Sequence, residues 1–129
     1  MTSFMTIISV ASGGAIGATL RLLLSGITHK YFVHVLPLGT LVVNLIGSFL
    51  IGVLFAYFHL NTALSPHIKT FLVTGILGAL TTYSTFAIES FFLLEAGQYL
   101  HAFANIALNL FGTILLAGAG YLLIMQLSK

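Results

Sequence analysis

The chain has no cysteine and no tryptophan, and charged residues are scarce: its 129 residues include four Lys and Arg and two Asp and Glu. The absence of cysteine excludes disulfides and thiol chemistry. Soluble domains carry about 25% charged residues, whereas this chain has 5%, so it cannot cover a water-exposed surface. A formal net charge of +2 is too small to indicate nucleic-acid binding. With 59% hydrophobic residues, the chain is expected to be an integral membrane protein.

The few charged residues divide the chain into long apolar runs. They are Arg21, Lys30, Lys69, Glu89, Glu95 and Lys129. A helix needs about 20 apolar residues to cross a bilayer, and the runs predict four such helices. The predicted spans are Phe4–Ser25, Leu38–Phe58, Thr70–Leu94 and Ala102–Leu127. We therefore expect an all-α protein in which residues 1–129 form a single transmembrane domain. The first run has no basic segment before it and exceeds the length of a signal peptide, so we expect it to be retained.

The stretch Gly75–Glu89 is unusual for a membrane span. Two glycines three positions apart weaken the helix, each by about 1 kcal/mol relative to alanine, and hydroxyl-bearing residues occupy positions 81–85. One interpretation is a helix broken near Gly78–Ser84, with polar groups at membrane depth that line a water-filled cavity. The alternative is an ordinary helix whose hydroxyls bond to carbonyls of the preceding turn. This stretch alone leaves both open.

Two other spans carry polar residues at four-residue spacing, which places them on one face of a helix. They are Thr40, Asn44 and Ser48 in the second span, and Asn105, Asn109 and Thr113 in the fourth. Hydrogen bonds between helices would explain such residues, at about 0.6–2 kcal/mol each. Alternatively, the stripes line a common pathway. In the first span, Gly13 and Gly17 form a small-residue surface that predicts close contact with another helix.

Two charged side chains lie within the predicted spans. Arg21 is about one turn from the end of the first span. It either extends to the membrane interface, or attracts anions to a vestibule, or contacts a second subunit. Glu89 lies one turn after Thr85 on the same face, and carboxylates inside membranes are functional candidates. The structural alternative is that Glu89, protonated or hydrogen-bonded, serves only as an acceptor for Thr85.

The polar stripes supply hydrogen-bond donors and, apart from Glu89, no fixed negative charge. Such a lining suits a small anion better than a metal cation, which needs several carboxylate or carbonyl oxygens. The electropositive edges of aromatic rings can also face an anion. No histidine lies at membrane depth to activate a serine or threonine, so we do not expect an enzyme.

The distribution of basic residues bears on assembly and orientation. Four helices make a thin bundle, which favours a homo-oligomer. Arg21 and Lys30 lie toward one end of the predicted bundle, and Lys69 and Lys129 toward the other. The excess of Lys and Arg normally marks the cytoplasmic side, so this balance sets no preferred orientation. It permits dual topology and an antiparallel homodimer.

Three motifs follow one another along the chain. They are Gly-Gly-x-x-Gly-x-x-x-Arg at 13–21, Gly-Thr-Leu-Val-Val-Asn at 39–44, and Gly-x-x-Gly-x-x-Thr-Thr-Tyr-Ser-Thr-Phe at 75–86. In this order, across four predicted spans, they resemble the Fluc (CrcB) family of fluoride ion channels, and the resemblance extends over the whole chain. It implies an antiparallel, dual-topology homodimer in the lipid of the bacterial inner membrane. The dimer would have two pores that export toxic fluoride passively.

The resemblance also implies roles for individual residues. The rings that face fluoride would be those of Tyr83 and Phe86, although the first position is often phenylalanine and tyrosine adds a hydroxyl beside the ring. The fluoride pathway would comprise Thr40, Asn44, Tyr83, Ser84, Thr85, Phe86, Glu89 and Thr113. Backbone carbonyls of Gly78 and Thr81, at the helix break, would hold a structural sodium ion (Na+) at the dimer centre.

Two functions from other classes are alternatives. A proton-coupled antiporter of the small multidrug type also has four spans and dual topology. Against it, Glu89 lies in the third span instead of the first, and tryptophan is absent. A non-transporting membrane assembly subunit would explain the small-residue faces but not three polar stripes.

Overall fold

The chain folds as four long helical segments joined by short loops. The computed structural model describes residues 3–129, and every regular element in that range is helical. In chain order they are α1 (Phe4–Tyr31), α2 (Leu38–Leu60), α3 (Pro66–Thr70), the π-helix η1 (Phe71–Leu77), α4 (Gly78–Leu80), α5 (Tyr83–Glu95) and α6 (Tyr99–Leu127). Four segments are long and apolar enough to cross a membrane, namely α1, α2, Pro66–Glu95 and α6. The prediction of an all-α protein with four spans is confirmed.

The first helix extends well beyond its predicted limit. α1 continues past Ser25 to Tyr31, and its last turn contains His29 and Lys30. Positive side chains are favourable at the C-terminal end of a helix dipole, and a long lysine side chain can reach the membrane interface. A basic residue therefore limits the embedded part of a span without ending the helix.

Two short turns reverse the chain on either side of the third segment. Ser65 caps α3 by accepting a backbone N–H at 3.3 Å, and Pro66 occupies the first turn, where its missing N–H removes no helical bond. After α5, Gly97 has φ 72°, a left-handed conformation that favours glycine. The Gln98 N–H then donates to the Leu93 carbonyl at 2.8 Å and closes the turn. These turns make neighbouring segments antiparallel.

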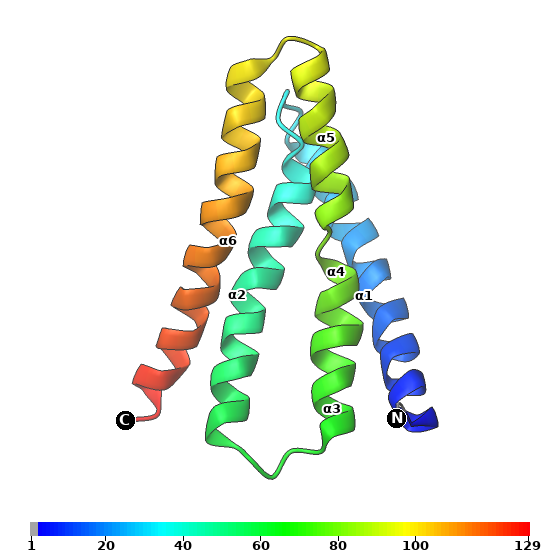
Figure 1. Cartoon of the computed structure of the whole chain (residues 1–129), viewed down its shortest axis with the longest axis vertical. Coiled ribbons are helices and arrows are strands. Elements are labelled where there is room, and N and C mark those ends of the chain that lie inside the picture. Colours follow the sequence, from blue (N-terminus) through cyan, green and yellow to red (C-terminus); the bar gives the residue numbers. More distant parts are fainter. Residues whose placement is uncertain (1–2) are drawn as a thin grey trace.

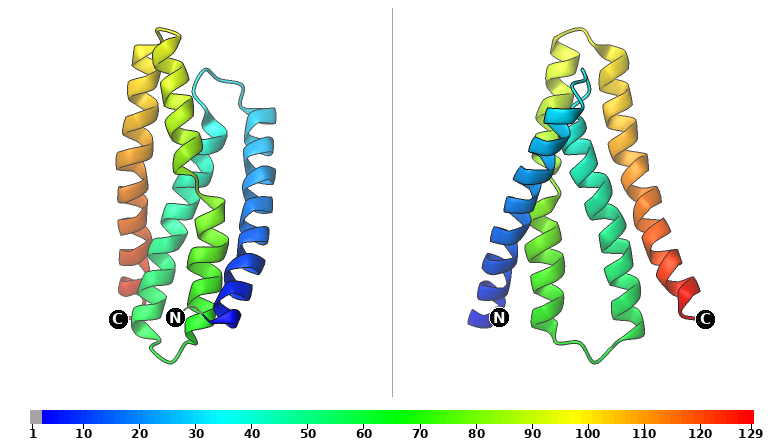
Figure 2. Two further views of the ribbon diagram at one scale, coloured as in Figure 1. Left: turned by 45° about the vertical axis from the view of Figure 1, so that its right-hand side comes forward. Right: turned by 180° about the vertical axis from the view of Figure 1, so that it is seen from behind.

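The four segments run alternately up and down (Figure 1). Both termini and the loop between α2 and α3 lie at one end, and the loops between α1 and α2 and between α5 and α6 lie at the other. α2 packs along α6, while α1 packs against η1 and α4 in the first half of the third segment. Figure 2 shows that these pairs spread apart toward the end that carries the termini.

Glycine allows both helix pairs to approach at backbone distance. A Cβ on Gly17 would lie 2.1 Å from the carbonyl oxygen of Ile76, and one on Gly52 would lie 2.0 Å from that of Ala117. Atoms in packed interiors do not approach so closely, so any larger residue must separate the helices. The predicted small-residue contact of α1 is therefore confirmed, with the third segment as its partner.

Replacing Gly17 with valine is expected to prevent formation of a monodisperse folded protein. Overpacking costs about 1–3 kcal/mol even where side chains can move, and here the obstacle is backbone. Gly14 offers a matched control, because a Cβ there would meet nothing within 4 Å. We expect Gly14→Val to elute as a single peak in detergent size-exclusion chromatography and to melt near the wild-type temperature. Equal recovery of the two variants would contradict this account of the contact.

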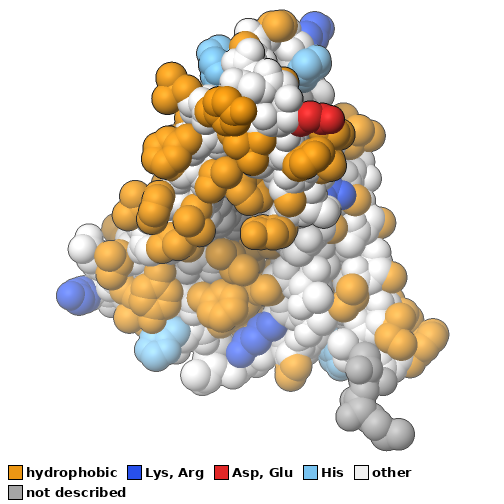
Figure 3. Space-filling view, turned by 45° about the horizontal axis from the view of Figure 1, so that its top comes forward, with side chains coloured by type: hydrophobic (Ala, Val, Ile, Leu, Met, Phe, Trp, Pro, Cys, Tyr) orange, Lys and Arg blue, Asp and Glu red, His pale blue; other side chains and the backbone are white. Residues whose placement is uncertain are grey.

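The buried core is small and lies beside the middle of the third segment. Val43, Leu77 and Leu80, from α2, η1 and α4, form one buried apolar cluster. Many large apolar side chains are exposed instead. Figure 3 shows hydrophobic side chains spread over the middle of the molecule, with lysine and histidine toward the ends. Exposed apolar surface of this extent fits contact with lipid or with another chain.

Candidate functional site

The third segment is broken at two residues. Between α4 and α5, Thr81 (φ −81°, ψ 157°) and Thr82 (φ −148°, ψ 121°) are extended. The turns before the break are also irregular, since Phe71–Leu77 forms a π-helix, a conformation that is frequent at functional sites. The predicted break near Gly78–Ser84 is confirmed, and the alternative of an ordinary helix is wrong.

Asn44 of α2 supplies hydrogen bonds that the broken backbone lacks. Its Oδ1 accepts from the Thr82 N–H at 2.8 Å, and its Nδ2 donates to the Thr82 carbonyl at 3.1 Å. Nδ2 also donates to Oδ1 of Asn109 on α6 at 2.9 Å. Polar backbone groups at membrane depth must be satisfied by protein or cavity water. This buried amide therefore stabilises the extended residue and fixes the start of α5.

A chain of hydrogen bonds continues from Asn109 back to α5. Its Nδ2 donates to the carbonyl and to Oδ1 of Asn105, at 2.9 and 3.2 Å. Asn105 Nδ2 donates to Ser90 Oγ at 3.0 Å, and Ser90 Oγ donates to the Phe86 carbonyl at 2.8 Å. The predicted pathway included only Thr113 from α6. The four-residue spacing was the signal for the two asparagines, whereas no pattern distinguished Ser90.

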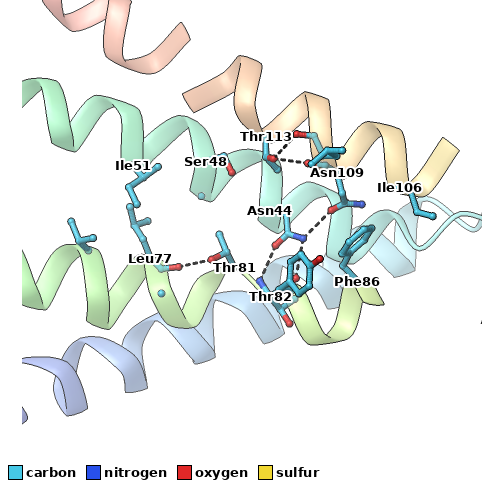
Figure 4. A pocket seen from close by; sticks show the side chains of 15 residues that line it. Asn44, Ser48, Ile51, Leu77, Thr81, Thr82, Phe86, Ile106, Asn109 and Thr113 are labelled. Carbon is cyan, nitrogen blue, oxygen red and sulfur yellow. Dashed lines mark hydrogen bonds between the residues drawn. The ribbon is translucent and has the colours of Figure 1, made fainter. Parts of the chain in front are cut away.

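A cavity of about 570 Å³ lies beside the break (Figure 4). Of the predicted site residues, it is lined by Asn44, Gly78, Thr81, Tyr83, Phe86 and Thr113. The rings of Tyr83 and Phe86 meet edge to face, with centroids 5.5 Å apart and planes at 66°. Tyr83 is 81% exposed, while Phe86 is partly buried. Ring edges are electropositive, so rings, amides and hydroxyls together make a lining suited to an anion.

Four more of the predicted residues line a second cavity of about 590 Å³. They are Arg21, Thr40, Thr85 and Glu89, from α1, α2 and α5. Glu89 Oε1 accepts from the Thr40 hydroxyl at 2.9 Å, and its Oε2 is buried without a hydrogen-bond partner within residues 3–129. Thr85 Oγ1 accepts from the Thr82 hydroxyl at 2.9 Å, and within the described residues no hydrogen bond joins Thr85 to Glu89. The alternative in which Glu89 accepts from Thr85 is therefore wrong.

The predicted pathway is thus divided between two cavities of one chain. Thr82 is buried and lines both of them. Ser84 is exposed and lines neither. Thr40 and Asn44 lie one turn apart on α2 but line different cavities. Helical spacing alone could not predict this division, because it places both residues on the same face.

The predicted sodium site consists of backbone carbonyls at the break. Gly78 and Thr81 both line the first cavity, and α4 ends there, where carbonyls lack partners within a helix. Backbone oxygens suit a hard cation, but such ions take about six oxygen ligands, more than two carbonyls provide. Within the described residues, no group of three or more His, Cys, Asp or Glu could hold a metal. Within one chain, Gly78 and Thr81 therefore supply fewer oxygen ligands than such an ion needs.

The chain is similar to one family model and to curated proteins that carry a common name. The model described as "CrcB-like protein, Camphor Resistance (CrcB)" matches residues 8–121. A "Fluoride-specific ion channel FluC" of Sulfurimonas denitrificans is 57% identical over 122 residues, 95% of each chain. Proteins of the same name from Nautilia profundicola and Aquifex aeolicus are each 46% identical over 118 residues. The alignment with the Nautilia profundicola protein covers 92% of both chains. The alignment with the Aquifex aeolicus protein covers 91% of this chain and 94% of the relative. From the family match and these identities, the chain belongs to the CrcB family.

Proposed function

We propose that this chain forms a fluoride-selective ion channel, which lets toxic fluoride leave a bacterial cell passively through the inner membrane. The observation that carries the proposal is the cavity beside the break, where amides, hydroxyls and the edges of two aromatic rings surround a common space. No residue lining that cavity is charged. The relatives named as fluoride-specific channels support the choice of ion.

Neutral donors suit fast passage of a small anion. A selective pore must replace the water of the ion, yet it must bind weakly enough for the ion to leave. Amide, hydroxyl and ring C–H groups meet both requirements, whereas a cation at the same depth would hold fluoride strongly in a low dielectric. In this proposal Arg21 attracts anions at the second cavity. Thr40, Thr85 and Glu89 continue the pathway there.

The functional unit is proposed to be an antiparallel homodimer with two pores. The Tyr83 ring is 81% exposed in one chain, and a ring that contacts an ion at membrane depth needs a second surface to exclude lipid. Ser84 is exposed beside it and would join the pathway only against a second chain. A two-fold axis repeats the same contacts on both copies, so an axis near the break would bring two breaks together.

A structural sodium ion is proposed at the axis of that dimer. Carbonyls of Gly78 and Thr81 from both copies would hold it, since both residues line the cavity at the break. Bound sodium would supply positive charge that stabilises the carbonyl oxygens brought together at the two breaks. The two residues on each chain would keep their carbonyls directed toward the axis.

The two alternatives from the sequence have less support. The relatives are named as ion channels, and neither a proton-coupled antiporter nor an assembly subunit fits that name. The same names agree with the expectation that the chain is not an enzyme. A fluoride flux that needs no proton gradient would separate the channel from the antiporter.

Liposomes that contain the purified protein are expected to release fluoride rapidly once a potassium ionophore balances the charge. Chloride should leave at least about a hundredfold more slowly. It is larger than fluoride and cannot approach several of the donors as closely, and each ~1.4 kcal/mol added to a barrier slows the rate tenfold. The measurement uses fluoride and chloride electrodes on the same preparation. Equal rates would contradict selectivity, and a lack of fluoride release would contradict the function.

A further inference from the structure

Ser48 of α2 differs from most hydroxyl residues inside the long helices. Serine and threonine in a helix commonly donate to a carbonyl of the preceding turn. Ser9, Ser12, Thr19, Thr28, Ser90 and Thr113 all donate to the carbonyl four residues earlier. Within residues 3–129, Ser48 makes no such bond, and Figure 4 draws none from its hydroxyl. The side chain is partly buried and lines the first cavity.

Most other polar side chains of this cavity already donate their hydrogens to acceptors within the protein. Asn44 and Asn109 each donate two hydrogen bonds to oxygens of the protein. Three hydroxyls also donate within the chain, those of Thr81, Thr82 and Thr113. Among the residues that line the cavity, the hydroxyls of Ser48 and Tyr83 are therefore the ones whose hydrogens remain available.

From this distribution of donors we propose that Ser48 contacts the permeating ion and provides a donor position one helical turn from Asn44. The inference rests on the proposed channel function. Four residues of α-helix rise about 6 Å, so Ser48 extends the donor lining along α2 past the asparagine. A hydroxyl with an uncommitted hydrogen can donate to an anion without first breaking a protein hydrogen bond. The amides would have to give up a partner to do the same.

The packing of α2 places this donor at the level of the break. Gly47, the residue before Ser48, lies directly against Thr81, since a Cβ on Gly47 would be 2.3 Å from Thr81 Cγ2. The close contact holds this turn of α2 beside the extended residues. Ser48 therefore has a fixed position relative to Tyr83 and Phe86, which follow the break and line the same cavity.

Fluoride efflux from liposomes tests the assignment, with flux normalised to the dimer recovered by size-exclusion chromatography. Ser48→Ala removes the donor and little volume, and we expect its flux to fall about tenfold, as for loss of one hydrogen bond to an ion. Ser48→Thr keeps a hydroxyl and should keep most of the flux. Ser12→Ala is the matched control, because the hydroxyl it removes already donates to its own helix and lines neither cavity.

Three results would overturn the assignment while the wild-type protein conducts. One is wild-type flux from Ser48→Ala. Another is an equal loss in the alanine and threonine variants, which would assign the effect to shape. The third is loss of the dimer in Ser48→Ala, which would assign the hydroxyl to a contact between subunits. A wild-type protein that releases no fluoride would instead overturn the channel function, and this inference with it.

Discussion

Fixing the chain in one membrane orientation is expected to abolish fluoride efflux, and coexpression of a chain fixed the opposite way is expected to restore it. The termini and the α2–α3 loop lie at one end of the molecule and the other two loops at the opposite end. Two basic residues lie toward each end, so a few added charges should decide orientation. If the pore needs antiparallel chains, a population with a single orientation cannot assemble it.

The exposed loops offer sites for these charges that leave both cavities unchanged. One variant carries Ala96→Lys with Gln98→Lys in the α5–α6 turn, and the other carries Thr62→Lys with Ala63→Lys in the α2–α3 loop. All four residues are exposed and line neither cavity. Each variant alone should show background efflux, and the mixture should approach wild-type efflux. Full activity from either variant alone, with its single orientation verified by surface labelling, would disprove the antiparallel dimer.

Much of the architecture could be predicted from the sequence because a membrane permits few backbone structures. Apolar runs of sufficient length must become helices that satisfy their own backbone, so four spans followed directly from the positions of charged residues. The presence of a break was predictable, since Gly78 and the hydroxyl residues after it suit an interrupted helix. Gly17 likewise indicated a close helix contact. Each of these predictions depends on residues near one another in the sequence.

The details of the site depend on contacts between distant residues, which spacing on one helix leaves open. Asn44 bonds to Asn109, 65 positions away, and Thr40 bonds to Glu89, 49 positions away. The rotation and crossing angle of the packed helices decide which neighbouring helix each polar residue faces. For this reason the sequence indicated one pathway, whereas the folded chain has two cavities separated at Thr82.

Replacing Phe86 with isoleucine is expected to leave a folded dimer that conducts almost no fluoride. Isoleucine keeps much of the apolar bulk, so the cost in stability should be about 1–3 kcal/mol, as for other shape changes in packed interiors. The Phe86 carbonyl, which accepts from Ser90, belongs to the backbone and remains in place. The substitution removes the electropositive ring edge from the cavity that Phe86 lines. If fluoride uses that edge to replace water, flux should fall by much more than about tenfold, since ~1.4 kcal/mol in a barrier is a factor of ten.

Two further variants decide whether the ring itself meets the ion. Phe91→Ile makes the same change on α5, at a side chain that is 54% exposed and lines neither cavity, so its flux should match the wild type. Tyr83→Phe keeps the second ring and its edge contact with Phe86 while removing the hydroxyl, and it should conduct. The measurement is fluoride efflux per recovered dimer. Near-normal flux from Phe86→Ile would mean that this ring only packs, and that amide and hydroxyl donors carry the ion alone.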